Sequence, residues 1–439
     1  MFGKMKAITI LALLAIVAGC AVQKDKNKRL TDYVNPFIGT TTLWDSIDLG
    51  YNPTRRAWGA ETFPGASLPN SMVQVTPVTM WRSGSGYQYE DTIIHAFVHT
   101  SKGHWNLCYV PLIAVSGNVE PKSYYTGYSH DNESASPGYY QVYLKKYDIN
   151  AEVTSSLRCG YHKYTYKNGK EKKLLVDLSH SNEHIRSWNI EKAGDNVFSG
   201  YQQTGPTFYF YAVTNHKIKD IESLKDGDTE VRIVNFINNE NINDPLEMKV
   251  GFSYVSVENA KKNLEAEILK KDFEQVRNEA SDTWEGLLSK IQVSGGTEIQ
   301  KETFYSALYK AFLWPILLSD VNGEYVDAKG EVVNKGFRYY SEPSFWDDYR
   351  NKLILLGMVS PDVTADVIKS ITDYGEIRGF MPRFFHGDHA SVFVTGSYLR
   401  GIHDFDVQKA YKILLNNAFA EGKGSRPHIK EYMLSLIHI

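Results

Sequence analysis

Residues 249–267 read Lys-Val-Gly-Phe-Ser-Tyr-Val-Ser-Val-Glu-Asn-Ala-Lys-Lys-Asn-Leu-Glu-Ala-Glu, and the pattern of the chain changes within them. The first six residues alternate polar or small with apolar side chains, which is the period of a strand. From Glu258 onward good helix formers follow each other with an approximate period of 3.6 residues. The stretch therefore predicts a β region before residue 257 and a helical region after it.

The region before this change contains short runs of aromatic and β-branched residues between Gly, Asn and Pro. Five of these runs are Tyr139–Leu144, Tyr161–Tyr166, Lys173–Asp177, Phe208–Val213 and Lys249–Tyr254. Strand-like runs at turn-separated intervals are typical of antiparallel sandwiches. We therefore expect an N-terminal antiparallel β-sandwich over residues 32–257.

The region after the change is predicted to consist of helices separated by loops. Residues 258–295 form a helical linker, with one helix from Phe273 to Leu288. Beyond it, Ser360-Pro361 has the form of a helix start, and Asp406 is placed to cap a helix running to about Ala420. Helices separated by loops with Trp, Asp, His and Arg suit an α/α toroid, although the pattern alone gives only a β domain followed by an α domain.

Composition narrows the function classes. The 439 residues are 42% hydrophobic and 23% charged, as in a soluble globular protein of two or more domains. The net charge of −3, with no Lys/Arg run among aromatics, argues against nucleic acid as a partner. There is no G-x-S-x-G motif, so hydrolysis through a serine is not expected.

The N-terminus predicts export. Lys4 and Lys6 precede a short apolar run that ends at Ala18-Gly19-Cys20. Such a run is a signal-peptide core rather than a spanning helix. The Ala-Gly-Cys ending resembles a bacterial lipobox, so residues 1–19 would be removed, Cys20 lipidated and residues 20–31 left as a tether. A plain secretory signal with an incidental cysteine is the alternative.

The other two cysteines, Cys108 and Cys159, lie in strand-like surroundings without metal-ligand spacing. One disulfide and two buried free thiols are both compatible with the sequence, because it gives no distance between them.

Aromatic, carboxylate and guanidinium side chains are concentrated in the segment Ser344-Phe-Trp-Asp-Asp-Tyr-Arg350. An aromatic face stacks on a pyranose ring while Asp and Arg side chains bind its hydroxyls. The alternative is a buried tryptophan beside a satisfied ion pair.

Further motifs lie in a fixed order along the chain: Tyr33-Val-Asn-Pro-Phe-Ile-Gly-Thr40, Thr62-Phe-Pro-Gly-Ala-Ser-Leu-Pro-Asn70, Gly86-Tyr-Gln-Tyr89, Phe304-Tyr-Ser-Ala-Leu-Tyr-Lys-Ala-Phe312 and Asp320-Val-Asn-Gly-Glu-Tyr325. Together with the segment around Trp346 they resemble glycoside hydrolase family 92, the calcium-dependent exo-acting α-mannosidases abundant in gut Bacteroidetes. The resemblance covers residues 32–433.

The resemblance implies an (α/α)6 catalytic domain behind the sandwich, of which residues 296–433 would be only the first part. It implies an exo-α-mannosidase, of α-1,2 or related type, that uses Ca²⁺ and an inverting pair of carboxyl groups. The acid Glu and base Asp of family members lie in motifs beyond Met433, so the catalytic residues and metal ligands stay unknown and this chain is expected to be inactive alone. Residues 434–439 resemble a translated sequencing adapter.

The resemblance also marks candidate substrate contacts, each with a structural alternative. Trp346, Asp347 and Arg350 match the family's F-W-D-x-Y-R motif. Other candidates are Trp58 and Glu61 in a Gly-rich loop, and His99, His104 and Trp105 in a loop that departs from the family's pattern. Glu61 is as readily a surface carboxylate, and His99 a structural histidine. His386-Gly-Asp-His389 is open to metal binding, substrate lining or loop packing.

The expected partners are mannose-containing glycans or glycoproteins and, through the lipid, a membrane. The expected location is the outer membrane, facing either the periplasm or the cell surface. A non-catalytic, surface glycan-binding lipoprotein is the competing function, since it would keep the aromatic and Asp/Arg contacts without an acid and base.

Overall fold

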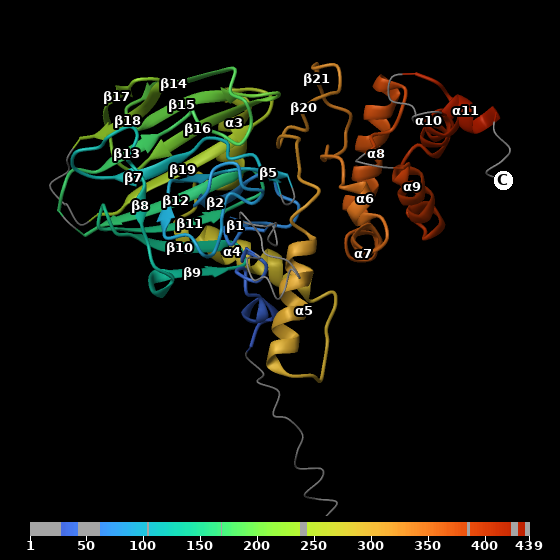
Figure 1. The fold of residues 1–439 in the computed structure, drawn as a ribbon, viewed down its shortest axis with the longest axis horizontal. Coiled ribbons are helices and arrows are strands. Elements are labelled where there is room, and N and C mark those ends of the chain that lie inside the picture. The colour runs from blue at the N-terminus through green and yellow to red at the C-terminus, as the bar shows by residue number, and fades with distance from the viewer. Residues whose placement is uncertain are drawn as a thin grey trace, which may run out of the picture.

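The computed structural model describes residues 28–42, 62–102, 105–167, 169–237, 244–383, 387–422 and 429–434. A β-rich part comes first and a helical part follows it (Figure 1). The last long strand ends at Ser253 and the next helix begins at Val257. The prediction of a β domain followed by an α domain is confirmed in this form.

Two large antiparallel sheets form the first part. The seven-stranded sheet has the order β1 (Ala66–Ser67), β2 (Gln74–Val78), β4 (Ala96–Val98), β7 (Leu112–Val115), β13 (Lys173–Val176), β18 (Thr229–Phe236) and β17 (Ile218–Asp226). The eight-stranded sheet has the order β14 (Ser187–Gly194), β15 (Val197–Gln203), β16 (Thr207–Thr214), β19 (Leu246–Ser253), β12 (Cys159–Tyr166), β11 (Ile149–Ser155), β10 (Tyr139–Leu144) and β9 (Glu133–Ser136).

Three small pairs lie outside these sheets. They are β3 (Ile93–Ile94) with β8 (Thr126–Gly127), β5 (Ser101–Lys102) with β6 (Trp105–Asn106), and β20 (Tyr325–Val326) with β21 (Val332–Val333). Two short 3-10 helices, η1 (Leu30–Tyr33) and η2 (His130–Asn132), complete the first part.

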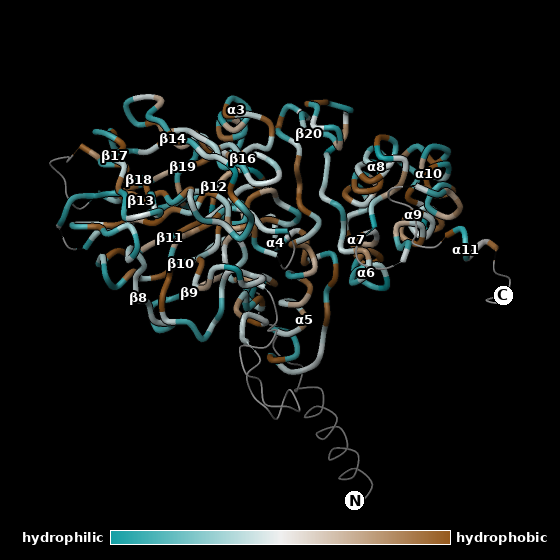
Figure 2. Tube along the Cα trace, turned by 45° about the horizontal axis from the view of Figure 1, so that its top comes forward, coloured by the Kyte–Doolittle hydropathy of each residue, from teal (hydrophilic) through white to brown (hydrophobic). Residues whose placement is uncertain are grey.

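The two large sheets enclose one hydrophobic core. In β16, for example, Phe208, Phe210 and Ala212 are buried while the residues between them are half-buried. Successive side chains of a strand point to opposite faces, so this alternation sends every second residue into the core. Figure 2, coloured by hydropathy, shows that both apolar and polar residues occur along the strands.

Two helices cover the outer face of the eight-stranded sheet. Helix α3 (Val257–Glu267) and helix α4 (Phe273–Leu288) place Leu264, Phe273 and Val276 against Tyr139 and Tyr161. Helix α4 begins with a capping box in which Asp272 and Gln275 satisfy each other's backbone N–H groups. This second apolar layer covers the beginnings of β10 and β12, which explains why consecutive residues are buried there.

The remaining helices form the second part. They are α5 (Glu298–Ala311), α6 (Phe345–Asp348), α7 (Lys352–Val359), α8 (Pro361–Arg378), α9 (His389–Leu399), α10 (Val407–Phe419) and α11 (Ile429–Leu434). Asp406 caps α10 as predicted, accepting a hydrogen bond from the Lys409 backbone N–H at 2.9 Å. Ser360 occupies the N-cap position of α8, but its hydroxyl makes no capping hydrogen bond.

Cys108 and Cys159 are both buried and free, so of the two alternatives the free thiols are the ones found. Burial raises the pKa of both thiols. Within the described ranges, no helix is both long enough and apolar enough to cross a membrane.

Candidate functional site

The short helix α6 has one buried face and one exposed face. Phe345 and Asp348 are buried, whereas Trp346, Asp347 and Arg350 are exposed. Residues three apart lie on the same side of a helix, so Phe345 and Asp348 anchor this turn together. The Trp346 side chain keeps 44% of its surface accessible. The alternative of a buried tryptophan is therefore wrong.

The ion pair that holds α6 is not the one expected from the sequence. Lys352 Nζ lies 3.2 Å from Asp348 Oδ2, and both side chains are largely buried. Burial lowers the pKa of Lys352 and raises the pKa of Asp348, because it disfavours the charged forms more than their attraction favours them. Lys352 Nζ also lies 5.1 Å from the ring centre of Trp314. This pair fixes α6 on α7.

The anchoring leaves Asp347 and Arg350 with their charges on the surface. The Asp347 carboxylate accepts a hydrogen bond from the Ser344 hydroxyl. The Arg350 guanidinium lies 4.4 Å from the ring centre of Tyr349 and donates weakly to the Trp346 carbonyl at 3.4 Å. No ion pair joins Asp347 to Arg350 or to any other side chain within the described ranges. Both groups are thus oriented by local contacts and present hydrogen-bonding capacity to solvent.

His389, the first residue of α9, belongs to the same surface. Its ring stacks on Tyr349 with 4.1 Å between ring centres and 4° between planes. Burial, followed by the positive charge of Arg350, lowers the pKa of His389. A neutral imidazole therefore continues the aromatic surface of Tyr349 at neutral pH. His386, the other histidine of that motif, lies outside the described residues.

The β5–β6 hairpin of the sandwich contacts the segment that leads into α6. Lys102 Nζ donates to Glu342 Oε1 at 2.6 Å, two residues before Ser344. On the same hairpin, Trp105 is half-buried and its indole N–H donates to Glu183 Oε1 at 3.1 Å. The structure thus links the hairpin that carries Trp105 to the α6 segment. His104, within the same hairpin, lies outside the described residues.

His99 lies elsewhere, in the sandwich core. The side chain is fully buried, and its two ring nitrogens are 3.0 Å from the Val110 carbonyl and 3.0 Å from His162 Nε2. A side chain without exposed surface offers nothing for a sugar to touch. These contacts agree with the interpretation of His99 as a structural histidine. They do not support a contact between His99 and the substrate.

The remaining candidates, which are Trp58, Glu61 and Cys20, lie outside the described residues. Across the described ranges, no three His, Cys, Asp or Glu side chains come close enough to hold a metal ion. The described residues therefore do not fit a calcium site.

Two residues of this surface, Lys352 and Glu342, were not expected from the sequence. Lys352 lies four residues after Asp348, a spacing that allows an ion pair on a helix and could have indicated it. His389 was named within its own motif, but its stacking on Tyr349 was not expected. Glu342 carries no sequence pattern, because its role depends on the fold bringing Lys102 beside it.

Two family models match the chain. The N-terminal domain of glycosyl hydrolase family 92 matches residues 33–265, and the catalytic domain of that family matches residues 259–436. The fold of a β-sandwich with following helices and the motif series agree with this match. The chain belongs to glycosyl hydrolase family 92.

Solved structures of the family share the fold. An α-mannosidase from Bacteroides thetaiotaomicron superposes with a TM-score of 0.83 at 24% identity, covering 93% of this chain and 59% of that chain. An inverting mannosidase from the same organism gives a TM-score of 0.79 at 22% identity, covering 90% of this chain and 56% of that chain. The first was also solved with mannoimidazole. The chain thus spans a little over half the length of these proteins. No curated protein matches its sequence.

Proposed function

We propose that this chain is part of an exo-acting α-mannosidase that trims mannose-rich glycans, with α-1,2 linkages or a related type as substrate. The observation that carries the proposal is the exposed Trp346 beside Asp347 and Arg350, whose charges form no ion pair among the described residues, within the region matched by the catalytic domain. The structural neighbours named as mannosidases support the choice of sugar.

Each residue of the α6 surface has a defined role in this proposal. Trp346 stacks on the apolar face of a terminal mannose, and Asp347 accepts hydrogen bonds from its hydroxyls. Arg350 donates to ring or hydroxyl oxygens, with its orientation set by Tyr349. The Asp348–Lys352 pair holds α6 in place without touching the sugar.

The acid and base are proposed to lie after Met433, as the family resemblance implies. An inverting hydrolase places them on opposite faces of the sugar, about 6.5–9.5 Å apart, with water between the base and the ring. We propose likewise that the full protein depends on calcium and that most of the calcium ligands lie after Met433. We propose that the full protein carries both and that this chain alone supplies substrate contacts without turnover.

The exposed apolar side chains of the second part support an incomplete toroid. Met358 is 71% exposed on α7, Leu399 is 78% exposed on α9 and Phe419 is 59% exposed at the end of α10. Large apolar side chains this exposed, one on each of three helices, are consistent with surfaces that further elements cover. We propose that further helices of an (α/α)6 barrel pack there.

The test compares two proteins. One is the chain as given, and the other is continued past Met433 by its own reading frame. We expect the longer protein to hydrolyse aryl α-mannosides, to lose activity on chelation and regain it with calcium, and to release the inverted anomer in NMR spectra. We expect the chain as given to show no turnover. Glycan binding without turnover by the longer protein would favour the glycan-binding lipoprotein instead.

A further inference from the structure

The β5–β6 hairpin has one face buried in the sandwich and one face turned outward. Ser101 pairs with Asn106, and Lys102 pairs with Trp105. Directly paired residues place their side chains on the same face of an antiparallel pair, about 5 Å apart. Ser101 and Asn106 are fully buried, whereas Lys102 and Trp105 are half-buried. Lys102 and Trp105 therefore lie side by side on the outer face.

This outer face adjoins the segment that leads into α6. Figure 1 shows β5 at the side of the sandwich that faces the helical part. The Lys102 ammonium donates to Glu342 Oε1 at 2.6 Å, and Glu342 lies four residues before Trp346. The hairpin face that carries Trp105 is thus joined to the segment that begins the α6 surface.

The Trp105 ring is fixed from the sandwich side. Its indole N–H donates to Glu183 Oε1 at 3.1 Å. The neighbouring Asn182 binds the chain at β6 twice: its backbone N–H donates to the Leu107 carbonyl at 3.2 Å, and its side-chain amide donates to the Asn106 carbonyl at 2.7 Å. A ring held in this way loses little freedom when a ligand stacks on it.

The Lys102–Glu342 pair is exposed enough to bind a ligand. The two side chains are 33% and 40% exposed. An ammonium has three donors and a carboxylate has two acceptor oxygens, so one contact between them leaves hydrogen-bonding capacity in both groups. Exposed ion pairs contribute little to stability. An aromatic ring beside such a donor and acceptor has the chemistry that binds a pyranose.

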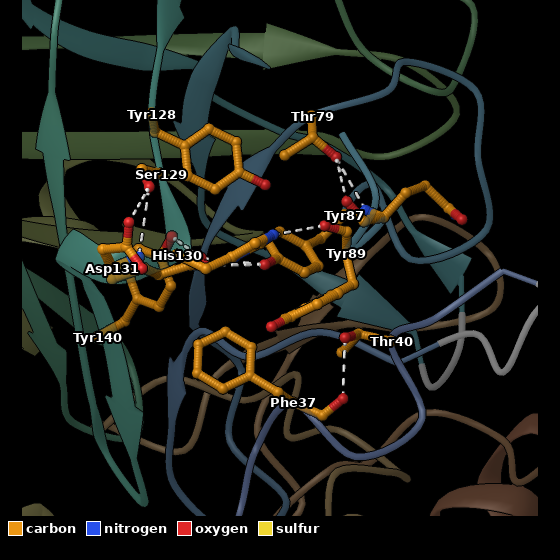
Figure 3. Close-up of polar contacts among 12 residues, drawn as sticks. Phe37, Thr40, Thr79, Tyr87, Tyr89, Tyr128, Ser129, His130, Asp131 and Tyr140 are labelled. Carbon is orange, nitrogen blue, oxygen red and sulfur yellow. Dashed lines mark hydrogen bonds and ion pairs between the residues drawn. The ribbon is translucent and has the colours of Figure 1, made fainter. Parts of the chain in front are cut away.

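A cavity of about 290 Å³ beside Tyr89 and His130 differs from the hairpin in this respect (Figure 3). The Glu133 side chain in its wall is only 1% exposed. The carboxylate accepts hydrogen bonds from the hydroxyls of Tyr87 at 3.0 Å and Tyr140 at 2.5 Å, and His130 Nδ1 lies 2.5 Å from its other oxygen. This carboxylate is engaged by the protein itself, unlike the polar groups of the hairpin.

We propose that Trp105, Lys102 and Glu342 bind the second sugar of the glycan, which is the sugar to which the terminal mannose is linked. Trp105 stacks on the apolar face of this sugar, while Lys102 and Glu342 bind its hydroxyls. The inference rests on the proposed function, in which the α6 surface holds the terminal mannose. The hairpin then makes the enzyme favour glycans over mannosides that have a small leaving group.

A purely structural hairpin that joins the sandwich to the helical part is the competing role. The two roles differ in their dependence on substrate. A structural change at the hairpin acts on every substrate alike, because it disturbs the site as a whole. Loss of a contact with the second sugar acts only on substrates that contain one.

The experiment uses the protein continued past Met433 and compares kcat/KM for two substrates. One is whichever of the α-1,2-, α-1,3- and α-1,6-linked mannobioses the parent cleaves fastest. The other is α-mannosyl fluoride, which has no second sugar. Trp105→Ala should lower kcat/KM for the mannobiose by about 10-fold and change it little for the fluoride. Lys102→Met should act in the same direction by a smaller factor.

Two further variants serve as controls. Trp105→Phe keeps a stacking ring and should recover most of the mannobiose activity lost in Trp105→Ala. Lys122→Met removes an exposed lysine that pairs with Asp226 at 3.0 Å elsewhere on the sandwich, and it should leave both substrates unchanged. If Trp105→Ala does not fold, the exposed Lys102→Met carries the same comparison between substrates.

Two results would overturn the proposal while the parent stays active and the proposed function stands. They are equal losses for both substrates, which indicate the structural role, or unchanged mannobiose hydrolysis in both Trp105→Ala and Lys102→Met. A parent that hydrolyses neither substrate would contradict the proposed function itself, and the contact with a second sugar would fall with it.

Discussion

His99 and His162 meet between the two sheets of the sandwich, with their Nε2 atoms 3.0 Å apart. When both rings are neutral, only one arrangement of protons satisfies all the contacts. Nδ1 of His99 faces the Val110 carbonyl and must donate, so Nε2 of His99 accepts from Nε2 of His162. Nδ1 of His162 then accepts from the Tyr164 hydroxyl at 2.9 Å. Burial lowers the pKa of both histidines, so both are neutral in the folded protein at pH 7.

The first prediction is that this pair makes the fold sensitive to acid. Burial lowers the pKa of His99 to about 3 and lowers the pKa of His162 well below its ordinary value. A lowered pKa means that the unfolded chain binds more protons below pH 6.5, so stability is present above that pH and is lost as pH falls. Below pH 6.5, each histidine should lower the free energy of unfolding by up to about 1.4 kcal/mol for every unit by which the pH falls. Urea unfolding from pH 7 to pH 4 measures this slope.

The variant His162→Gln separates the pair from other acid-sensitive groups. Its amide keeps a donor for His99 but cannot titrate, so the slope below pH 6.5 should flatten by about 1.4 kcal/mol per pH unit. His180→Gln is the control. In the parent, the pKa of His180 is raised, chiefly by the hydrogen bond to Asp177, so His180 contributes stability below pH 6.5. An identical slope for His162→Gln and the parent would contradict the assignment.

The second prediction concerns Asp347 in the longer protein. Asp347→Asn removes a charge-assisted hydrogen bond to a sugar hydroxyl, and kcat/KM should fall by about 1.5–3 kcal/mol of transition-state binding. The melting temperature should stay within a degree or two of the parent, because the carboxylate forms no ion pair within the described ranges.

The adjacent residue provides a matched control. Asp348→Asn leaves Lys352 largely buried without its partner, which should destabilise the fold by about 3 kcal/mol. Kinetics of the folded fraction should change little. If Asp347→Asn lowers the melting temperature as much as Asp348→Asn does, Asp347 is a structural residue and the sugar contact is excluded.

Local sequence patterns predicted much of the fold. The run Tyr139–Leu144 has the bounds of β10, the helix from Phe273 to Leu288 has those of α4, and Asp406 caps α10. Each of these elements depends on the periodicity of apolar residues, on composition or on capping, all within a few residues of the chain. The approach of His99 to His162 is not local, because it depends on how two sheets stack.

The candidate site was predictable in part. Exposure of Trp346, Asp347 and Arg350 agrees with a surface role. The motif could not say which aspartate is buried, because Asp347 and Asp348 are adjacent and identical in kind. The answer depends on Lys352 and on the packing of Phe345 beneath α6.

The third prediction concerns the proposed lipid anchor. Cys20→Ser removes the sulfur that would carry the acyl chains, so the protein should move from the membrane fraction to the soluble fraction. Cell fractionation with palmitate labelling of the parent measures the change. Cys108→Ser is the control, since that thiol is buried and free in the fold. Unchanged partitioning of Cys20→Ser, or an unlabelled parent, would favour a plain secretory signal.

The fourth prediction tests how the two parts of the chain are joined. Asp320 follows α5, and its buried carboxylate accepts hydrogen bonds from Ser253 at 2.7 Å, Asn259 at 2.8 Å and Asn263 at 2.7 Å. It thereby joins the end of β19 and helix α3 to the segment that leads to α6. Burial raises the pKa of Asp320 despite these three donors. Asp320→Ala should destabilise the fold by about 2–4 kcal/mol, because buried donors lose their acceptor.

Asp320→Asn is the informative companion, since it keeps one acceptor oxygen and removes the charge. It should recover part of the stability lost in Asp320→Ala, as measured by urea unfolding at pH 7. The exposed Asp404, 35 residues from its partner Lys369, gives the control Asp404→Ala, which should change stability by less than about 1 kcal/mol. Equal stabilities for Asp320→Ala and Asp404→Ala would show that Asp320 does not hold the two parts together.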